Sequence, residues 1–292
     1  MQEFVYERPG TIEEAVAAIG AGDARPLAGG TDLVPQLREG RRQAGRIVDL
    51  KFVPEMMAIA TLADGGVSIG AAATAAAVAR HAAIAARYPA VAQSAQLIGG
   101  VQVQNRASLG GNICNAAPSA DGVPALICHA ARALIAGPTA RREMPVESLF
   151  AAPGRTNLAA DELLVAIVLP PAGPRAAAAY LRFTPRREMD IAVAGAGAWL
   201  RLDADGAIAE ARIALASVAP TPIRATTAEQ KLMGERPSRA LFEEAGRRAA
   251  QDARPISDTR GSADYRRTLA AVLTARALSR CGGQLGCEVV VR

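Results

Sequence analysis

The chain has 292 residues, a formal net charge of +5 and a pI of about 9.4, and half of its residues are hydrophobic. This length suits two domains of ordinary size, or one domain with an appended lobe. Aromatic residues are only 3% of the chain, so alanine, valine, leucine and isoleucine have to fill the interior.

The positive charge is carried mostly by arginine pairs that are dispersed along the chain. They are Arg41–Arg42, Arg141–Arg142, Arg186–Arg187 and Arg247–Arg248. Dispersed pairs are typical of a solvated surface, and no aromatic stacking residues lie among them, which disfavours a nucleic-acid-binding module. An anionic cofactor or an acidic protein partner would account for the same bias.

Several other classes of protein are disfavoured by what the chain lacks. The cysteines form no Cys-x-x-Cys pair, and there are only two histidines, so a zinc site is poorly supported. The N-terminus shows no basic region followed by an apolar run, and no long apolar stretch is free of charges. We therefore expect a cytoplasmic protein without a signal peptide or a membrane-spanning helix.

The predicted elements alternate between helices and strands in the first 170 residues. A strand is followed by a helix that begins with the capping box Thr11–Glu14, a glycine turn, a second helix and a strand at 46–50. After these the sequence predicts a strand at 67–70, an alanine-rich helix at 74–86, a helix at 122–130, and strands at 133–135 and 162–169.

The run PPAGPR at 170–175 is the best candidate for a domain boundary, because it combines proline and glycine. Predicted strands follow at 176–183, 191–201 and 207–216, and predicted helices at about 238–251 and 263–280. Strands followed by helices favour an α+β arrangement in which the helices cover one face of an antiparallel sheet.

The first glycine motif is LAGGTDL at 27–33, where an apolar strand end runs into two glycines, a hydroxyl and an acid. Glycines at such a turn let backbone N–H groups converge on an anion, and the following helix adds its dipole. The motif is a plausible pyrophosphate cradle, although it lacks the Walker lysine and the three-glycine Rossmann pattern. The alternative is a plain strand–turn–helix corner with Asp32 as the helix cap.

The second glycine motif is SLGGNICNAAPSAD at 108–121. Asn112 can donate and accept hydrogen bonds, and Asp121 can accept them from sugar or ribityl hydroxyls. The alternative is a buried irregular loop whose backbone needs side-chain partners. Cys114, inside this motif, is expected to be a buried hydrophobe, as is Cys128, whereas Cys281 and Cys287 lie in a glycine-rich tail and are expected to be mobile.

The two motifs together resemble the FAD subunits of molybdenum hydroxylases, a group that includes the medium subunits of aerobic carbon monoxide dehydrogenase and the middle domain of xanthine dehydrogenase. Two further segments agree with the resemblance, FTPRREMDIA at 183–192 and GSADYRR at 261–267. The four segments occur in the right order over nearly the whole chain. The resemblance implies an α+β protein with the two-lobed FAD-binding fold of the vanillyl-alcohol oxidase type, followed by a C-terminal α+β domain.

The same resemblance implies how the chain is divided. Residues 1–170 would form the FAD-binding domain, with a small lobe at about 1–55 and a larger lobe at about 56–170, and residues 176–292 the C-terminal domain. The cofactor would lie between the lobes, with 29–33 at the pyrophosphate, Asp121 at the ribityl chain and Arg182 beside the flavin ring. A cation there would stabilise reduced flavin, although a surface arginine on a strand is an equal alternative.

The implied cofactor-binding residues come from the two motifs and from the strand after the boundary. They are Leu27, Ala28, Gly29, Gly30, Thr31, Asp32, Leu33, Ala107, Ser108, Gly110, Gly111, Asn112, Asn115, Asp121 and Arg182. No catalytic acid or base and no metal ligand is expected. The segment 186–192 is expected to meet the flavin or partner subunits, and Asp264–Arg267 is expected to be structural.

The function implied is electron transfer by an oxidoreductase subunit. Electrons would pass from iron–sulfur clusters of a small subunit, through FAD, to an external acceptor, while a large subunit with molybdenum cofactor hydroxylates the substrate. The resemblance further implies a dimer of heterotrimers. The rivals are a stand-alone FAD-dependent reductase of the same fold class and a flavin-free binding module. A cysteine-rich insertion that would hold an iron–sulfur cluster is absent from this sequence.

Overall fold

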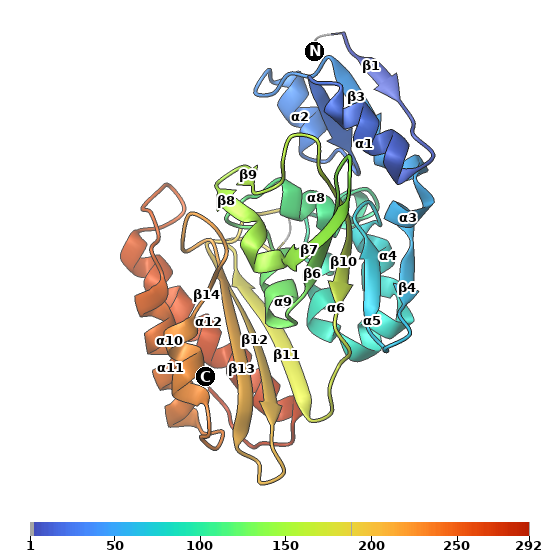
Figure 1. Ribbon diagram of the computed structural model, residues 1–292. Helices are drawn as coiled ribbons and strands as arrows, with labels where there is room; N and C mark the ends of the chain where they lie inside the picture. The colour runs from blue at the N-terminus through green and yellow to red at the C-terminus, as the bar shows by residue number, and fades with distance from the viewer. Residues whose placement is uncertain (1–2, 188, 292) are drawn as a thin grey trace.

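A computed structural model describes residues 3–187 and 189–291, so Glu188 in the 183–192 segment lies outside the described residues. The chain forms an N-terminal lobe, a middle lobe and a C-terminal part, stacked in chain order (Figure 1). The fold is mixed α and β, as the sequence predicts.

The N-terminal lobe is a parallel sheet of order β1-β3-β2, built from β1 (Val5–Glu7), β2 (Ala24–Leu27) and β3 (Arg46–Asp49). Its helices are α1 (Ile12–Gly20) and α2 (Leu33–Arg38). The predicted capping box is confirmed, because the Thr11 side chain accepts from the Glu14 amide at 3.1 Å and the Glu14 carboxylate accepts from the Gly10 amide at 2.7 Å. Strand β2 ends at Leu27, which is the first residue of the first glycine motif.

The middle lobe packs helices against a sheet of order β4-β5-β10-β6-β7. The strands are β4 (Ile59–Thr61), β5 (Val67–Gly70), β6 (Arg132–Ala136), β7 (Arg141–Pro145) and β10 (Leu163–Leu169), with a hairpin of β8 (Phe150–Ala152) and β9 (Arg155–Thr156). The helices are α3 (Pro54–Met57), α4 (Ala75–Arg80), α5 (Ala82–Arg87), α6 (Pro89–Gln96), α7 (Val101–Gln104), α8 (Leu109–Cys114) and α9 (Gly122–Cys128), with 3-10 turns η1 (Leu50–Phe52) and η2 (Val146–Leu149).

One predicted helix differs in the middle lobe. The prediction of a continuous helix over 74–86 is wrong, because His81 adopts an extended conformation (ψ 120°) and separates α4 from α5. The other strands and helices predicted for this region are found within two residues of their expected ends.

The C-terminal part is an antiparallel sheet of order β11-β12-β13-β14 whose helices cover one face, as predicted, although three helices are found where two were predicted. Its elements are β11 (Ala176–Phe183), β12 (Ala194–Leu202), β13 (Ile208–Ala216), β14 (Ile223–Arg224), α10 (Thr226–Leu232), α11 (Arg239–Asp252) and α12 (Ala263–Gln284). Alternation along β11 sends Ala177 and Ala179 to the helices, and Ala178 and Tyr180 to the middle lobe. The C-terminal sheet therefore lies between its own helices on one face and the middle lobe on the other (Figure 1).

The cysteines in the core differ in part from the expectation. Cys128 is buried as expected, but Cys281 is also buried, because α12 extends through it to Gln284. The expectation that Cys281 is a mobile thiol is therefore wrong.

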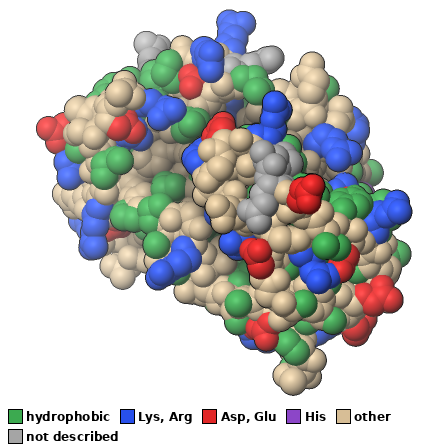
Figure 2. Space-filling model, turned by 90° about the horizontal axis from the view of Figure 1, so that it is seen from above, with side chains coloured by type: hydrophobic (Ala, Val, Ile, Leu, Met, Phe, Trp, Pro, Cys, Tyr) green, Lys and Arg blue, Asp and Glu red, His purple; other side chains and the backbone are tan. Residues whose placement is uncertain are grey.

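The surface agrees with a dispersed charge distribution. Figure 2 shows Lys and Arg side chains scattered among Asp, Glu and apolar residues on the face seen from above the N-terminal lobe. Among the described residues, no helix is long and apolar enough to cross a membrane, and no group of three or more His, Cys, Asp and Glu side chains is arranged to hold a metal ion.

Candidate functional site

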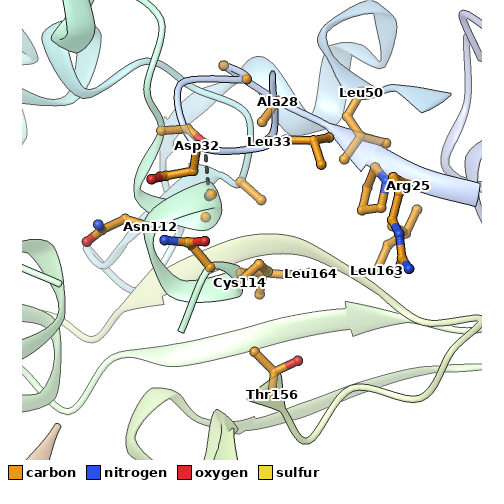
Figure 3. Close-up of a pocket in the computed structure, with 18 of the residues that line it drawn as sticks. Arg25, Ala28, Asp32, Leu33, Leu50, Asn112, Cys114, Thr156, Leu163 and Leu164 are labelled. Carbon is orange, nitrogen blue, oxygen red and sulfur yellow. Dashed lines mark hydrogen bonds between the residues drawn. The ribbon is translucent and has the colours of Figure 1, made fainter. Parts of the chain in front are cut away.

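A cavity of about 320 Å³ lies between the N-terminal and middle lobes, and both glycine motifs line it (Figure 3). Its wall includes every predicted cofactor-binding residue except Leu27, Asp121 and Arg182. The residues included are Ala28, Gly29, Gly30, Thr31, Asp32, Leu33, Ala107, Ser108, Gly110, Gly111, Asn112 and Asn115. Residues 80 positions apart in the sequence thus converge on one space.

The first motif presents a run of free backbone donors to this cavity. Gly30 has φ +76°, a conformation that glycine adopts without strain and that turns the chain from β2 into α2. The amides of Gly29, Gly30, Thr31 and Asp32 have no hydrogen-bond acceptor within the described part of the chain. Consecutive unpaired N–H groups beside a cavity favour an anionic ligand.

The carboxyl group of Asp32 also belongs to the cavity wall rather than to the helix cap. Asp32 stands at the N-cap position of α2, but its side chain accepts no capping hydrogen bond. Partial desolvation of the carboxyl group raises the pKa of Asp32, while the charge of Arg41 acts in the opposite direction. The alternative in which Asp32 serves as a side-chain cap is therefore excluded.

The two motifs contact each other directly through backbone atoms. A Cβ at Gly29 would lie 1.9 Å from the carbonyl oxygen of Arg106 and 2.8 Å from the Cα of Ala107. Only glycine permits so close an approach of the two lobes. Gly110 is equally constrained, because its Cβ would lie 2.3 Å from the carbonyl oxygen of Ala71.

The polar side chains of the second motif hold its own shape and join the lobes. Ser108 caps α8 by accepting from the Gly111 amide at 3.0 Å, and Asn112 Oδ1 accepts from the Gly122 amide at 3.2 Å. Asn115 Oδ1 accepts from Gln36 Nε2 of α2 at 3.2 Å, across the cavity. The motif is not an irregular loop throughout, because Leu109–Cys114 forms α8. Ser108 and Asn112 do serve as side-chain partners for backbone amides, as the structural alternative expects, and both also line the cavity.

Sequence reasoning missed several residues of the wall. Arg25 and Arg42 contribute guanidinium groups from the N-terminal lobe, and Thr156 and Glu162 come from the far side of the middle lobe. Arg42 belongs to a pair that was interpreted as solvated surface. Nothing in the local sequence marks Thr156 or Glu162, which follow the end of the second motif at Asp121 by 35 and 41 positions. The same wall holds two arginines and two carboxylates, Asp32 and Glu162, and Glu162 is paired with Arg142.

Lys51 supports the first motif from behind and was also missed. Its ammonium group donates to the carbonyl oxygen of Ala28 at 2.8 Å and to Asp49 Oδ1 at 2.5 Å. Asp49 is buried and also accepts from the Tyr6 hydroxyl at 2.5 Å. This chain of contacts fixes the strand end immediately before Gly29.

The expectation that Cys114 is a buried hydrophobe is wrong. The residue is exposed and contributes to the wall of the cavity, where Figure 3 shows it near Leu164. Cys114 ends α8 on the side that faces the open space, so tight packing does not cover it.

Asp121 and Arg182 lie together, but outside the cavity wall. Arg182 forms an ion pair with Asp121 Oδ2, and Asp121 Oδ1 accepts from the Tyr180 hydroxyl at 2.8 Å. Both ionic side chains are about nine-tenths buried. Burial raises the pKa of Asp121, whereas Arg182 and the two hydrogen bonds act in the opposite direction. The cluster ties β11 of the C-terminal sheet to the end of the second motif.

The residues of the cavity fit the FAD that the resemblance implies. Unpaired amides and two arginines suit a pyrophosphate, and Leu33, Leu50 and Leu163 provide apolar surface for an aromatic ring system (Figure 3). Gly29 closes the N-terminal lobe tightly on the middle lobe beside the polar part, and Gly110 packs its helix closely on Ala71 within the middle lobe.

Comparison with known proteins agrees with this geometry. Residues 2–172 match the FAD-binding domain in molybdopterin dehydrogenase, and residues 160–281 match the carbon monoxide dehydrogenase flavoprotein C-terminal domain. The putative xanthine dehydrogenase FAD-binding subunit of Escherichia coli (strain K12) is 33% identical over 96% of this chain and 98% of its own.

Two comparisons with carbon monoxide dehydrogenase of Hydrogenophaga pseudoflava agree. Its medium chain is 32% identical over 94% of this chain and 96% of its own. A solved structure of that enzyme, in a form that lacks the Mo-pyranopterin moiety of the molybdenum cofactor, superposes with a TM-score of 0.93 at 31% identity, covering 97% of this chain and 98% of that chain. The chain therefore belongs to the family of FAD-binding medium subunits of the xanthine and carbon monoxide dehydrogenases, and is an oxidoreductase subunit whose cofactor is FAD.

Proposed function

We propose that this chain holds FAD in the cleft between its two N-terminal lobes and relays electrons from iron–sulfur clusters of a partner subunit to an acceptor outside the complex. The observation that carries the proposal is the run of four unpaired amides, Gly29 to Asp32, in a cavity shared with the second glycine motif. The relatives named as FAD-binding subunits or medium chains support it.

Within this proposal the first motif binds the pyrophosphate through its amides and the Thr31 hydroxyl. Gly110 and Gly111 approach it from the middle lobe, and Arg25 and Arg42 neutralise its charge. Asn112 and Asn115 line the same wall, and Lys51 holds Ala28 in position from outside the cavity. The residues of this chain therefore bind and orient the cofactor.

Bound FAD supplies redox chemistry that connects one-electron and two-electron carriers. The chain contributes position, an electrostatic environment and a wall that excludes water. Neither His81 nor His129 lines the cavity, and His129 is buried at the end of α9. Electron transfer requires no acid or base from this chain, so the absence of a histidine from the wall is consistent with the proposal.

The ion pair of Asp121 and Arg182 is proposed to border the flavin end of the site. If Arg182 lies near the pyrimidine part of the flavin, its charge favours the reduced anionic form. Arg182→Met is then expected to lower the reduction potential of bound FAD, measured by dye-equilibrated titration. An unchanged potential with intact FAD binding would restrict Arg182 to joining the domains.

The assembly proposed is a dimer of heterotrimers in the cytoplasm, with a large molybdenum-cofactor subunit and a small iron–sulfur subunit. Residues 1–170 would act as the FAD-binding domain and 176–292 as the C-terminal domain. The solved carbon monoxide dehydrogenase of Hydrogenophaga pseudoflava, an enzyme with a molybdenum cofactor, supports the first partner. The rival, a stand-alone FAD-dependent reductase, is disfavoured because the relatives match over nearly their whole length as subunits.

Cofactor binding is tested on the purified chain. The absorption spectrum is recorded before and after denaturation, and the released nucleotide is identified by chromatography. FAD is expected, and Gly111→Val is expected to reduce its content because the new side chain enters the cavity wall. Gly173→Val is the control, because nothing lies within 4 Å of the Cβ that the substitution adds. Gly154→Val is unsuitable as a control, because Gly154 has φ +72°, a backbone conformation in which valine is strained. A folded, colourless chain that takes up no added FAD would overturn the proposal.

The electron relay is tested with the partner. The reduced iron–sulfur subunit is mixed anaerobically with the oxidised, FAD-loaded chain, and loss of flavin absorbance is followed by stopped-flow spectroscopy. Bleaching is expected with the FAD-loaded wild-type chain, and with the Gly111→Val chain only in proportion to the FAD that it retains. Failure of the loaded chain to accept electrons from the subunit would contradict the relay while leaving FAD binding intact.

A further inference from the structure

A hydrogen bond between two side chains joins the N-terminal lobe to the middle lobe across the cavity. Gln36 Nε2 donates to Asn115 Oδ1 at 3.2 Å, although the two residues are 79 positions apart in the sequence. Both residues line the cavity, and both are half-buried. The bond therefore lies where a cofactor in the cavity would contact both lobes.

Gln36 reaches the cavity because of its position in α2. Its amide donates to the carbonyl oxygen of Asp32 at 3.1 Å, so it lies one helical turn after the first glycine motif reaches Asp32. Residues one turn apart share a helix face, and Asp32, Leu33 and Gln36 all line the cavity. Gln36 therefore lies on the cavity side of α2, as the end of the first motif does.

The bond from Gln36 selects the orientation of the Asn115 side chain. Asn115 follows α8, and its backbone amide donates to the carbonyl oxygen of Gly111 at 2.9 Å, which fixes the main chain. The side-chain amide can still rotate by half a turn and exchange its oxygen with its NH2 group. Because the N–H of Gln36 can donate only to the oxygen, the oxygen of Asn115 is turned to Gln36. The NH2 group of Asn115 is then left with no partner in residues 3–187 and 189–291.

Asn112 shows the same arrangement within the middle lobe. Its oxygen accepts from the Gly122 amide at 3.2 Å, and its NH2 group has no protein partner in the described part of the chain. Both asparagines thus have their oxygens occupied and their donors available on the cavity wall. Asn112 is oriented by a backbone amide of its own lobe, whereas Asn115 is oriented by a side chain of the other lobe. The orientation of Asn115 therefore depends on Gln36.

An NH2 group on this wall suits the charge of the expected ligand. The amides of residues 29–32 already offer donors to the cavity that have no acceptor within the described chain. The oxygens of a pyrophosphate accept hydrogen bonds and cannot donate them, so an NH2 group attracts them and an amide oxygen repels them. A flip of the Asn115 amide would therefore replace a favourable contact with an unfavourable one.

We propose that Gln36 is a positioning residue for FAD, which holds the oxygen of Asn115 and thereby keeps the NH2 group of Asn115 turned to the pyrophosphate. The inference rests on the function proposed above, because it requires FAD in the cavity. Gln36 acts through Asn115, and the bond forms only when the two lobes are closed on each other. The N-terminal lobe thus sets the polarity of a side chain that belongs to the middle lobe.

The experiment measures nucleotide binding to the apoprotein by titration at constant ionic strength. The ligands are FAD and ADP, because ADP carries the pyrophosphate without the flavin. Gln36→Leu and Gln36→Glu are each made in the wild-type chain and in the Asn115→Leu chain. Gln251→Leu is the matched control, because Gln251 is an exposed glutamine in α11. The Tm of each apoprotein is measured beforehand to establish that it is folded.

Gln36→Leu is expected to raise the Kd for both nucleotides about 3- to 10-fold, the size of one hydrogen bond. Gln36→Glu is expected to raise it further, because a carboxylate accepts from the NH2 group of Asn115 and draws it away from the pyrophosphate. In the Asn115→Leu chain, Gln36→Leu is expected to change the Kd by less than about twofold, because no amide remains to be oriented. In that chain the effect of Gln36→Glu reports only its added charge. Gln251→Leu is expected to bind both nucleotides as the wild-type chain does.

Wild-type affinity in the Gln36→Leu chain overturns the inference. An equal effect of Gln36→Leu with and without the Asn115 side chain also overturns it, because Gln36 would then act independently of Asn115. Weaker binding of FAD with unchanged binding of ADP would place the pair away from the pyrophosphate, with the same consequence. A wild-type chain that binds neither nucleotide contradicts the proposed function instead.

Discussion

Gly29→Ala is the substitution that tests the meeting of the two lobes most directly. The new Cβ would lie 1.9 Å from the carbonyl oxygen of Arg106, 2.4 Å from its carbonyl carbon and 2.8 Å from the Cα of Ala107. These are backbone atoms that cannot rotate away. Ordinary contact begins at 3.4 Å, so the glycine turn and the second motif have to separate by up to 1.5 Å (3.4 minus 1.9).

The size of the effect follows from that displacement. Overpacking of this kind costs about 1–3 kcal/mol. The strain is relieved by opening the cleft, which moves the unpaired amides away from the position that suits a pyrophosphate. If the whole cost appears in cofactor binding, the Kd for FAD rises about 5- to 150-fold, because each 1.4 kcal/mol is a factor of about ten.

The assay is FAD titration of the apoprotein by fluorescence, with thermal unfolding of the apo and loaded forms. Gly283→Ala is the control, since Gly283 lies in α12 with nothing within 4 Å of its Cβ. It is expected to leave FAD affinity unchanged and to stabilise the helix by up to about 1 kcal/mol. A Gly29→Ala chain with wild-type FAD affinity and stability would refute the reasoning, because the lobes would then not be in contact at this point.

Three further substitutions test the supporting network, the C-terminal domain and a buried histidine. Lys51→Met removes the donor to the carbonyl oxygen of Ala28. It is expected to lower the free energy of unfolding by about 1–3 kcal/mol and to weaken FAD binding in the same titration, whereas Lys51→Arg is expected to retain most of the FAD affinity. Arg266→Gln is expected to cost about 2–3 kcal/mol in urea unfolding, because buried Arg266 donates to two carbonyls and a carboxylate; exposed Arg267→Gln should stay within about 0.5 kcal/mol. Burial lowers the pKa of His129 from 6.5 to about 4, so the unfolded chain binds the proton first and stability falls as pH drops from 6.5 to 4. His129→Phe is expected to remove about 3 kcal/mol of this loss in the free energy of unfolding between pH 6.5 and pH 4. If the free energies of unfolding of the wild-type and His129→Phe chains fall in parallel over this range, the pKa of His129 is not lowered.

The sequence predicted the local elements because their signals are local. The capping box at Thr11, the alternating strands and the proline–glycine run all act within a few residues. The division of α4 from α5 at His81 was missed, since both halves have the same alanine-rich composition and only packing selects the break. The structural interpretation of the Asp264–Arg267 segment is also consistent with what is found, as Arg266 joins Val193 and Ser217 within the C-terminal domain.

The candidate site was predictable where glycines marked it. The two motifs supply most of the cavity wall, because a turn that needs Gly30 at positive φ leaves a visible pattern in the sequence. Arg25, Lys51 and Thr156 carry no such pattern. Whether Cys114 is buried or faces a cavity depends on distant segments that folding brings opposite it, and the residues next to it in the sequence give no information about those segments.

By itself the sequence determined the elements, the two glycine turns and the family to which their order belongs. The tertiary structure alone decided which groups meet: the backbone of Gly29 against Arg106, the ammonium of Lys51 behind Ala28, and the buried pair of Asp121 and Arg182. The physical reason is that backbone conformation is set by nearby residues, whereas burial, pairing of charges and the shape of a cavity are set by segments that folding brings together from distant positions.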